Sequence, residues 1–190
     1  GFQDSVICLH NPPPDVSVEA LQMRTHPAWR RIKFDELLAQ QLSMRQHYRE
    51  RRARGAPPLP PRQQLGAALL ERLSFPLTAA QQRVCAEISA DLARTHPMQR
   101  LLQGDVGSGK TVVAALAACQ AIENGFQAAI MAPTEILAEQ HYLKLSAWLE
   151  PLGITIAWLS GSLGKKDKRI ALERTASGEA QLAIGTHALF

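Results

Sequence analysis

The chain has 190 residues, of which 46% are hydrophobic, 20% charged and 5% aromatic. These proportions are ordinary for a globular protein with a buried core, and they exclude collagen-like, wholly disordered and disulfide-scaffold proteins. The formal net charge of +4 arises in residues 1–62, which hold ten basic and six acidic side chains, whereas residues 63–190 hold eleven of each. We therefore expect two parts of different character on one chain.

Neither a membrane span nor a secretory leader is indicated. The longest apolar run, residues 112–119, is much shorter than the ~18–20 residues that cross a bilayer. The chain does not open with a basic region followed by a long apolar stretch. Cys8, Cys85 and Cys119 lie far apart and form no CxxC pair, which predicts buried free thiols in a reducing cytoplasm.

Residues 1–24 predict a short strand over 6–9 and then a stiff connector, because the prolines at 12–14 donate no backbone hydrogen bond and hold an extended course. Thr25 and Pro27 predict the start of a helix that continues to about residue 54. Its predicted apolar face consists of Phe34, Leu37, Leu38, Leu42, Met44 and Tyr48.

The last turns of this helix are rich in arginine, at positions Arg45, Arg49, Arg51, Arg52 and Arg54. Such a run is either a solvated helix end that suits the helix dipole or a contact with nucleic-acid phosphates. A proline-rich segment at 55–61 then ends the helix, and we place a domain boundary near residues 55–63.

Beyond the boundary, helices alternate with short apolar strands. Helices are expected over residues 64–73, 79–95, 110–123, 135–149 and 167–177, and strands over 99–103, 127–132, 154–159 and 180–184. Gly125 and Gly178 stand where helix-ending glycines belong. This alternation predicts an α/β fold with a parallel sheet, right-handed crossovers and helices on both faces.

Residues 104–111 read GDVGSGKT and match the phosphate-binding pattern G-x-x-x-x-G-K-[ST] in full. Glycines let backbone N–H groups turn inward to cradle a phosphate, and the helix that follows directs its positive end at the same anion. We expect Lys110 to reach the β- and γ-phosphates of a nucleotide and Thr111 to bind magnesium, both as catalytic residues. The predicted nucleotide site comprises Gly104, Asp105, Val106, Gly107, Ser108, Gly109, Lys110 and Thr111.

Two other motifs have both a structural and a functional interpretation. Thr78 and Gln81 have the spacing of a capping box at the start of the 79–95 helix. Thr134 stands between a predicted strand and a predicted helix, as an N-cap does, but the carboxyl end of a parallel strand is also where ligands bind. Residues 185–187 end the last predicted strand at the same edge.

Four segments together resemble the first-lobe motifs of superfamily 2 helicases, and most closely those of the RecG family of bacterial ATP-dependent DNA helicases. These segments are FPLTAAQ at 75–81, GDVGSGKT at 104–111, APTEILAEQH at 132–141 and GTHALF at 185–190. The likeness covers the whole chain, because HNPPP at 10–14 and residues 25–44 resemble the segment that joins the wedge domain of that family to its motor.

The resemblance implies ATP and magnesium as cofactors and branched or double-stranded DNA as the partner. It implies that Gln81 recognises adenine with Phe75 beside the base, and that Thr134, Gly185, Thr186 and His187 contact the DNA backbone. It further implies a monomeric protein of the bacterial cytoplasm, associated with the nucleoid, with single-strand-binding protein as another partner. Residues 161–169 are basic and are either a solvated surface or a further DNA contact.

The resemblance also divides the chain into three parts. Residues 1–24 are expected to be the end of a wedge domain and a proline-rich connector, residues 25–62 a basic helix and linker, and residues 63–190 an incomplete RecA-like lobe. No predicted strand ends in the Asp-Glu pair that completes the magnesium site of a hydrolysing motor. In the RecG family this pair follows the GTHALF-like segment, so we expect the chain to stop before it and to be inactive alone.

The function implied is an ATP-dependent helicase that remodels branched DNA in repair and recombination. Two alternatives remain open from the residues. One is a double-stranded DNA translocase of the transcription-repair coupling type, whose loop usually has an aromatic residue where this chain has Ser108. The other is a non-motor P-loop module, which leaves the paired motifs at Thr134 and Thr186 without an explanation.

Overall fold

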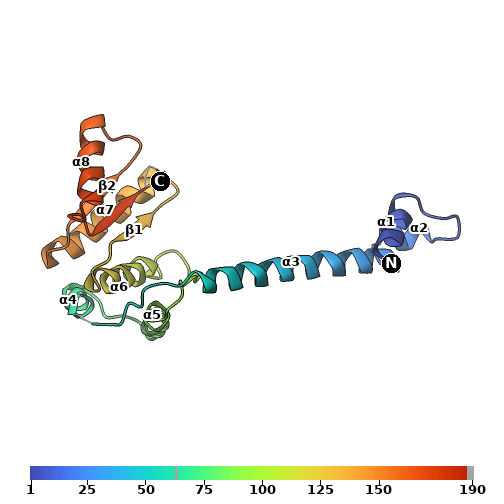
Figure 1. Cartoon of the computed structure of the whole chain (residues 1–190), viewed down its shortest axis with the longest axis horizontal. Coiled ribbons are helices and arrows are strands. Elements are labelled where there is room, and N and C mark those ends of the chain that lie inside the picture. The colour runs from blue at the N-terminus through green and yellow to red at the C-terminus, as the bar shows by residue number, and fades with distance from the viewer. Residues whose placement is uncertain (63, 188–190) are drawn as a thin grey trace. The chain divides into compact units, whose positions relative to one another are not determined.

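The computed structural model describes residues 1–62 and 64–187, and the chain divides into two compact units, residues 1–55 and 56–190 (Figure 1). Unit 1 contains α1 (Phe2–His10), α2 (Val18–Gln22) and α3 (Pro27–Ala53). The elements of unit 2 are α4 (Gln64–Arg72), α5 (Ala79–Leu92), α6 (Lys110–Glu123), β1 (Ala128–Met131), α7 (Glu135–Leu149), the 3-10 turn η1 (Glu150–Leu152), β2 (Ile156–Leu159), α8 (Lys165–Ala176) and β3 (Leu182–Gly185).

The predicted strand over residues 6–9 is wrong, because this segment belongs to helix α1. A short apolar run has no periodicity that separates a strand from one side of a helix. In the structure Val6 and Leu9, three residues apart, are half-buried, and α1 packs on α3. The tertiary contact with α3 therefore decides the conformation of this segment.

Helix α3 begins at Pro27 as predicted, but its cap is His26 and not Thr25. The His26 Nδ1 atom accepts a hydrogen bond from Ala28 N at 3.2 Å, while the Thr25 hydroxyl donates to Ala20 O. Proline at the first helical position makes the residue immediately before it the cap, and this residue is His26. The Trp29 indole donates to Leu21 O at 3.0 Å and ties α2 to the start of α3.

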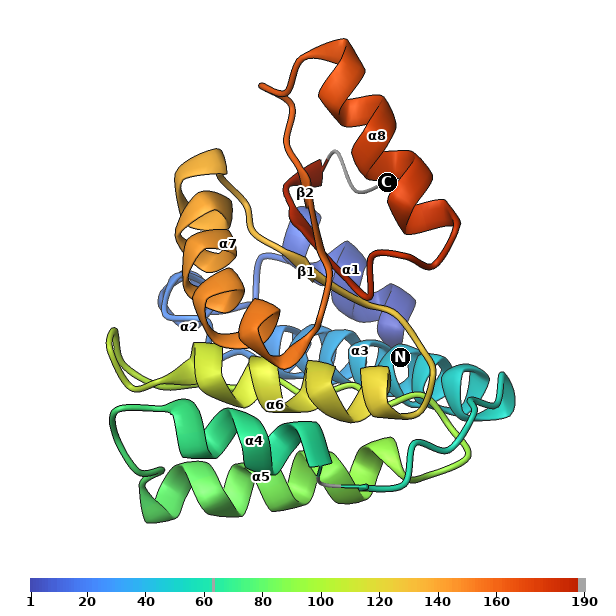
Figure 2. The same ribbon diagram turned by 90° about the vertical axis from the view of Figure 1, so that its left-hand side faces the viewer.

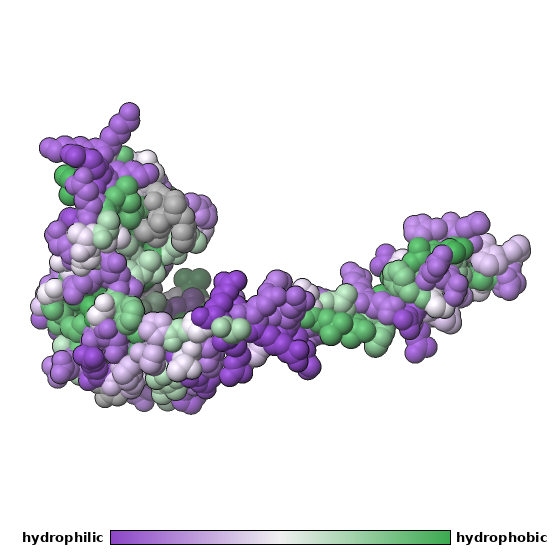
Figure 3. Space-filling view, viewed as in Figure 1, coloured by the Kyte–Doolittle hydropathy of each residue, from purple (hydrophilic) through white to green (hydrophobic). Residues whose placement is uncertain are grey.

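The predicted apolar face of α3 remains exposed in the structure. Phe34, Leu37 and Leu42 each have more than half of their surface accessible, and Figure 3 shows green, apolar surface along this helix. Within the arginine-rich end, Arg52 lies over the Tyr48 ring with its guanidinium carbon 5.4 Å from the centroid. The described residues of unit 1 therefore leave both the apolar and the basic surface of α3 uncovered.

In unit 2 the three strands form a parallel sheet in the order β1–β3–β2. The chain crosses from β1 over β3 to β2 through α7 and then returns to β3 through α8. Because parallel crossovers are right-handed, connections that run in opposite directions place their helices on opposite faces. Figure 2 shows α7 and α8 on opposite sides of the sheet, which confirms the predicted α/β arrangement.

The prediction of a strand over residues 99–103 is wrong, since the structure gives this segment no regular conformation. Leu102 and the preceding residue Met98 pack against Ile88 of α5 and Val112 and Val113 of α6, whereas Leu101 is exposed.

The side chain of Arg100 is held by α5 as well. Its Nε atom lies 2.5 Å from Asp91 and its Nη1 atom 2.7 Å from Glu87. A strand requires a neighbour that accepts its backbone hydrogen bonds, and no strand among the described residues pairs with this segment. Side-chain contacts with α5 therefore hold residues 99–103 in place.

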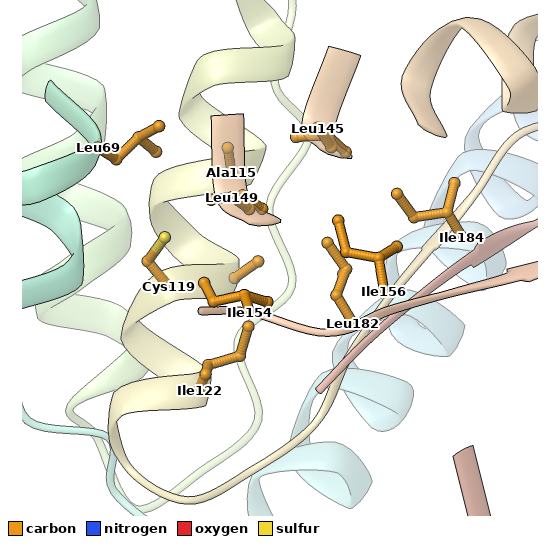
Figure 4. Packing of buried hydrophobic residues seen from close by; sticks show 11 residues of the cluster. Leu69, Ala115, Cys119, Ile122, Leu145, Leu149, Ile154, Ile156, Leu182 and Ile184 are labelled. Carbon is orange, nitrogen blue, oxygen red and sulfur yellow. The ribbon is translucent and has the colours of Figure 1, made fainter. Parts of the chain in front are cut away.

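The main core lies between the sheet and helices α4, α6 and α7 (Figure 4). Its fully buried side chains include Leu69, Leu145, Leu149, Leu182 and Ile184. Burial on one face of α6 fixes this helix against the sheet. The phosphate-binding pattern at its N-terminus is therefore attached to the most deeply packed part of the unit.

The three cysteines are free thiols, as predicted, but only Cys119 is buried; Cys8 and Cys85 are half-buried. Burial in the apolar core raises the pKa of the Cys119 thiol to about 12, so it stays protonated. Gly125 and Gly178 follow α6 and α8 with φ of 82° and 79°, which confirms both as helix-ending glycines.

No helix within residues 1–62 or 64–187 is long and apolar enough to cross a membrane. The same residues contain no group of three or more histidine, cysteine, aspartate or glutamate side chains that could hold a metal ion.

The ends of β2 and β3 approach each other so closely at Gly185 that no side chain fits there. A Cβ atom added to Gly185 would overlap the carbonyl of Leu159 in the adjacent strand. We expect Gly185→Ala to destabilise the protein by about 1–3 kcal/mol, because the strands must separate to admit a methyl group. Thermal unfolding followed by circular dichroism measures the effect.

The matched control is Gly66→Ala in α4, where an added Cβ would stand at an ordinary 3.8 Å from Leu116. Alanine favours a helix over glycine, so this variant should be neutral or more stable by up to about 1 kcal/mol. Equal unfolding temperatures for the two variants would contradict the close packing at Gly185.

Candidate functional site

The loop at residues 104–111 joins the segment that follows α5 to the start of α6. Gly107 and Gly109 have φ of 83° and 82°, in the left-handed region that favours glycine, and Gly109 is the N-cap of α6. Ser108 N donates to Asp105 O at 3.1 Å and closes the turn. The sequence pattern thus corresponds to a compact loop at a helix N-terminus.

Lys110 extends across this loop. Its Nζ atom donates to Gly104 O at 2.7 Å and to Asp105 O at 2.8 Å. An ammonium group has three donors, so one N–H of Lys110 remains for a ligand. The adjacent residues Val112 and Val113 are buried, and they anchor the first turn of α6 beneath the lysine.

Two of the loop glycines lie close to neighbouring side chains. A Cβ atom at Gly104 would come within 2.6 Å of Ser108 Oγ, and one at Gly109 would overlap the Gln81 amide. The loop therefore offers a cationic side chain, a helix N-terminus and backbone that a ligand can approach closely. These features suit a phosphate group and fit the nucleotide predicted from the sequence.

Gln81 links this loop to α5. The predicted capping box is confirmed, since Thr78 Oγ1 accepts from Gln81 N at 3.2 Å and Gln81 Oε1 accepts from Thr78 N at 2.8 Å. The Gln81 Nε2 atom also donates to Ser108 O at 2.9 Å. One amide N–H and one oxygen lone pair remain, so the side chain has the capacity to bind an adenine edge without losing either bond.

Phe75 lies in the turn before α5, six residues upstream of Gln81. It is 41% exposed, so part of its ring is accessible to a ligand.

The other predicted site residues lie at the carboxyl ends of the strands. Thr134 is the N-cap of α7, as predicted, and its hydroxyl accepts from Leu137 N at 3.4 Å. Gly185 O accepts from Ala132 N at 2.9 Å, and Thr186 N donates to Leu159 O at 3.2 Å. These bonds join the ends of all three strands, so Thr134 and Thr186 occupy one edge of the sheet.

His187 follows at this edge and is exposed. The remainder of the GTHALF segment, residues 188–190, lies outside the described residues.

Sequence reasoning did not identify Glu135 as a site residue, although it follows Thr134. Its Oε1 atom accepts from Ser160 Oγ at 2.6 Å and from Ser162 N at 3.0 Å. These donors, the Ser160 hydroxyl above all, hold the pKa of the Glu135 carboxyl below its usual range, so the group is ionised at neutral pH. No local pattern could have shown this pairing, because the partners are 25 and 27 residues away in the sequence.

A cavity of about 800 Å³ lies elsewhere in unit 2, between α4, α5 and α6. Its lining is mainly apolar and includes Leu70, Leu77 and Leu116, but none of the predicted site residues. The loop and the strand ends therefore remain the candidate site.

Comparison with known protein families matches residues 78–190 to the family described as DEAD/DEAH box helicase. Among curated relatives, the ATP-dependent DNA helicase RecG of Pasteurella multocida is 50% identical over 100% of this chain and 27% of its own length. The protein of the same name from Escherichia coli K12 is 49% identical over 96% of this chain and 26% of its own length. This chain thus spans about a quarter of the length of the relatives it matches.

A solved structure described as RecG bound to a three-way DNA junction also resembles this chain. It superimposes with a TM-score of 0.76 and 41% sequence identity, over 82% of this chain and 21% of that one. At this identity the likeness extends to sequence as well as fold.

The bond from Gln81 to the loop can be tested apart from its role as a cap. In Gln81→Glu the carboxylate still accepts from Thr78 N, but it brings an oxygen against Ser108 O in place of the donor. We expect the free energy of unfolding to change by less than about 0.5 kcal/mol, because the site is exposed. The affinity for a fluorescent ATP analogue should fall about tenfold, because the loop loses its hydrogen bond from the neutral amide and gains repulsion between two oxygens.

Gln82→Glu is the matched control, since Gln82 is the next residue of α5 and its amide donates to Leu77 O instead. Nucleotide affinity that falls equally in both variants would contradict a specific link between Gln81 and the loop.

Proposed function

Because this chain belongs to the DEAD/DEAH box helicase family, we propose that it supplies the ATP-binding part of a DNA helicase of RecG type. The whole protein would remodel branched DNA, such as stalled forks and junctions, in repair and recombination. Identity of about one half to RecG helicases over essentially the whole chain supports the proposal, as does the likeness to RecG bound to a three-way junction.

The observation that carries the proposal is the geometry of the loop at residues 104–111. Its left-handed glycines, the position of Lys110 and the buried first turn of α6 together form a cationic turn at a helix N-terminus. Such a turn offers backbone N–H groups and an ammonium group to a phosphate.

In the proposed complex, the backbone N–H groups of the loop and the Lys110 ammonium would hold the phosphates of ATP. Thr111 would supply a hydroxyl ligand to magnesium, and Gln81 and Phe75 would face the adenine. Bound magnesium would neutralise charge on the phosphates and so assist their hydrolysis. By resemblance to the RecG family, the acidic partner of this site would follow the GTHALF-like segment at residues 185–190.

For DNA, Thr134, Gly185, Thr186 and His187 would face the sugar-phosphate backbone from the carboxyl edge of the sheet. Hydroxyl and backbone N–H donors bind phosphate regardless of base sequence, which is what a moving enzyme requires. We propose the same division of the chain as before, with residues 1–24 and 25–62 leading from a wedge domain into the motor.

The remaining proposals come from the resemblance to RecG helicases. A monomer would act in the cytoplasm in association with the nucleoid, and single-strand-binding protein would be a further partner. The alternative of a non-motor P-loop module predicts ATP turnover that is indifferent to DNA, and a translocase of the transcription-repair type predicts little preference for branched DNA.

ATP turnover by the full-length protein distinguishes these possibilities. We expect stimulation by a model fork to exceed stimulation by linear duplex. Lys110→Ala should lower the stimulated kcat/KM by about 100-fold or more, because an interaction with the transferred phosphate is lost. Lys110 is exposed, and within residues 1–62 and 64–187 its ammonium group bonds only to loop carbonyls, so the free energy of unfolding of the variant should change little.

Lys144→Ala is the control for loss of a positive charge, since this lysine lies on α7 over the Trp148 ring. Turnover that persists in Lys110→Ala would refute the assignment of the loop. Turnover that no DNA changes would leave the loop as a nucleotide site and exclude the helicase.

A further inference from the structure

The proline-rich linker at residues 56–61 is hydrogen-bonded to the helices of unit 2. Its four prolines have no backbone N–H group, so only Ala56 and Leu59 can donate. Ala56 N donates to Thr95 O at 2.8 Å, and Leu59 N donates to Leu92 O at 2.9 Å. Both donors of the linker are therefore used at the C-terminal end of α5 and just beyond it.

Helix α6 binds the carbonyl groups of the linker. The Gln120 amide nitrogen donates to Leu59 O at 2.6 Å and to Ser89 O of α5 at 3.2 Å. Asn124, the C-cap of α6, donates to Pro60 O at 2.9 Å. A primary amide has two N–H donors, and Gln120 uses both of them. One side chain thus joins the linker, α5 and α6.

Gln120 is the buried polar residue of an otherwise apolar helix face. It is only 8% exposed, and the other buried residues of α6 are valine, alanine, cysteine and isoleucine. A buried amide needs hydrogen-bond partners, whereas an apolar side chain of the same length would pack on α5 without them. The polar group of Gln120 therefore serves its contacts with the linker and with α5.

The two helices that hold the linker both begin at the nucleotide loop. Helix α5 starts beside Gln81, whose amide donates to Ser108 O, and α6 starts at Lys110. The helices pack on each other. Gln120 comes ten residues after Lys110, about 15 Å along a helix of ordinary rise. The loop thus lies at one end of this helix pair and the linker at the other.

The connection from the loop to the linker contains few bonds that can rotate freely. Packed helices carry a displacement from one end to the other as rigid elements. Prolines fix the φ angle, so a proline-rich segment is a semi-rigid, extended spacer. A movement of the nucleotide loop would therefore reach the linker as long as the linker remains bonded to α5 and α6.

We infer that Gln120 is a positioning residue that couples ATP turnover to the remodelling of DNA: it holds the linker on the two helices of the nucleotide loop, so that residues 1–55 follow the movement of this loop. The inference rests on the proposed function and adds to it the point at which the motor holds the preceding part of the chain. Gln120 contacts neither nucleotide nor DNA in the proposed complex, so it transmits movement and takes no part in the chemistry.

The test uses Gln120→Met in the full-length protein, because methionine keeps the length of the side chain and removes both donors. The measurements on a model fork are ATP turnover and the number of base pairs separated per ATP hydrolysed. We expect turnover and the KM for ATP to stay within about twofold of the wild-type values. The base pairs separated per ATP should fall about fivefold, the lower end of the coupling between two sites. A merely structural defect lowers turnover and strand separation together and leaves their ratio unchanged.

Gln127→Met is the matched control, since the Gln127 amide also donates to two backbone carbonyls, those of Thr175 and Ala180, at 2.7 and 2.8 Å. These carbonyls lie at the end of α8 and after it, so the linker keeps its bonds and the ratio should be normal. Asn124→Ala removes the other side-chain bond to the linker and should lower the ratio as well. This variant gives the test a second readout where Gln120→Met fails to fold.

Hydrogen exchange followed by mass spectrometry tests the attachment of the linker without DNA. Residues 57–61 contain a single backbone N–H group, that of Leu59, because the other four residues are prolines. We expect this amide to exchange about tenfold faster in Gln120→Met than in the wild-type protein, since local opening of a segment exposes its hydrogen bonds to solvent.

Equal numbers of base pairs separated per ATP in Gln120→Met and Gln127→Met would overturn the coupling. Equal exchange rates of the Leu59 amide in Gln120→Met and the wild-type protein would overturn the attachment. Either result leaves the proposed function standing as long as the wild-type protein separates the strands of a fork with ATP. A wild-type protein that does not act on the fork would instead refute the proposed function itself.

Discussion

The contact between the carboxyl ends of β2 and β3 holds together the edge of the sheet on which the proposed DNA contacts stand. Gly185 brings its backbone against the Leu159 carbonyl, and Thr186 N then donates to that same carbonyl at 3.2 Å. On the other side Gly185 O accepts from Ala132 N. One residue without a side chain thus fixes Thr134, the loop after β2 and Thr186 relative to one another.

The nucleotide loop depends on a different kind of support. Its own residues are exposed, so its shape comes from left-handed glycines, from the Lys110 bonds to loop carbonyls and from the buried side of α6. The Gln81 side-chain amide accepts from Thr78 N at the start of α5 and donates to Ser108 O, so it connects α5 to the loop before α6.

Both sites place the polar ends of secondary structure at the surface and their apolar sides in the core. Helix α6 packs on the sheet through Ala115, Cys119 and Ile122, and α7 through Leu145 and Leu149. The N-termini of these two helices follow the loop and Thr134, respectively. Packing of these apolar faces therefore sets the positions of both helix N-termini.

The sequence by itself determined the features that are local. The loop at 104–111, the helices over 110–123 and 135–149, the capping box at Thr78 and the cap at Thr134 all depend on residues within a few positions of each other, and the structure has them as predicted. The parallel sheet followed from the alternation of apolar segments, because covered strands and amphipathic helices differ in length and period.

Only the tertiary structure decided the features that depend on distant partners. Residues 6–9 are helical because they pack on α3, and residues 99–103 form no strand because side chains of α5 and α6 hold them away from a ladder. The pairing of Glu135 with Ser160 and the close approach at Gly185 join residues about 25 positions apart. Short-range patterns contain no information on such contacts, since these exist only after the sheet has brought its strand ends together.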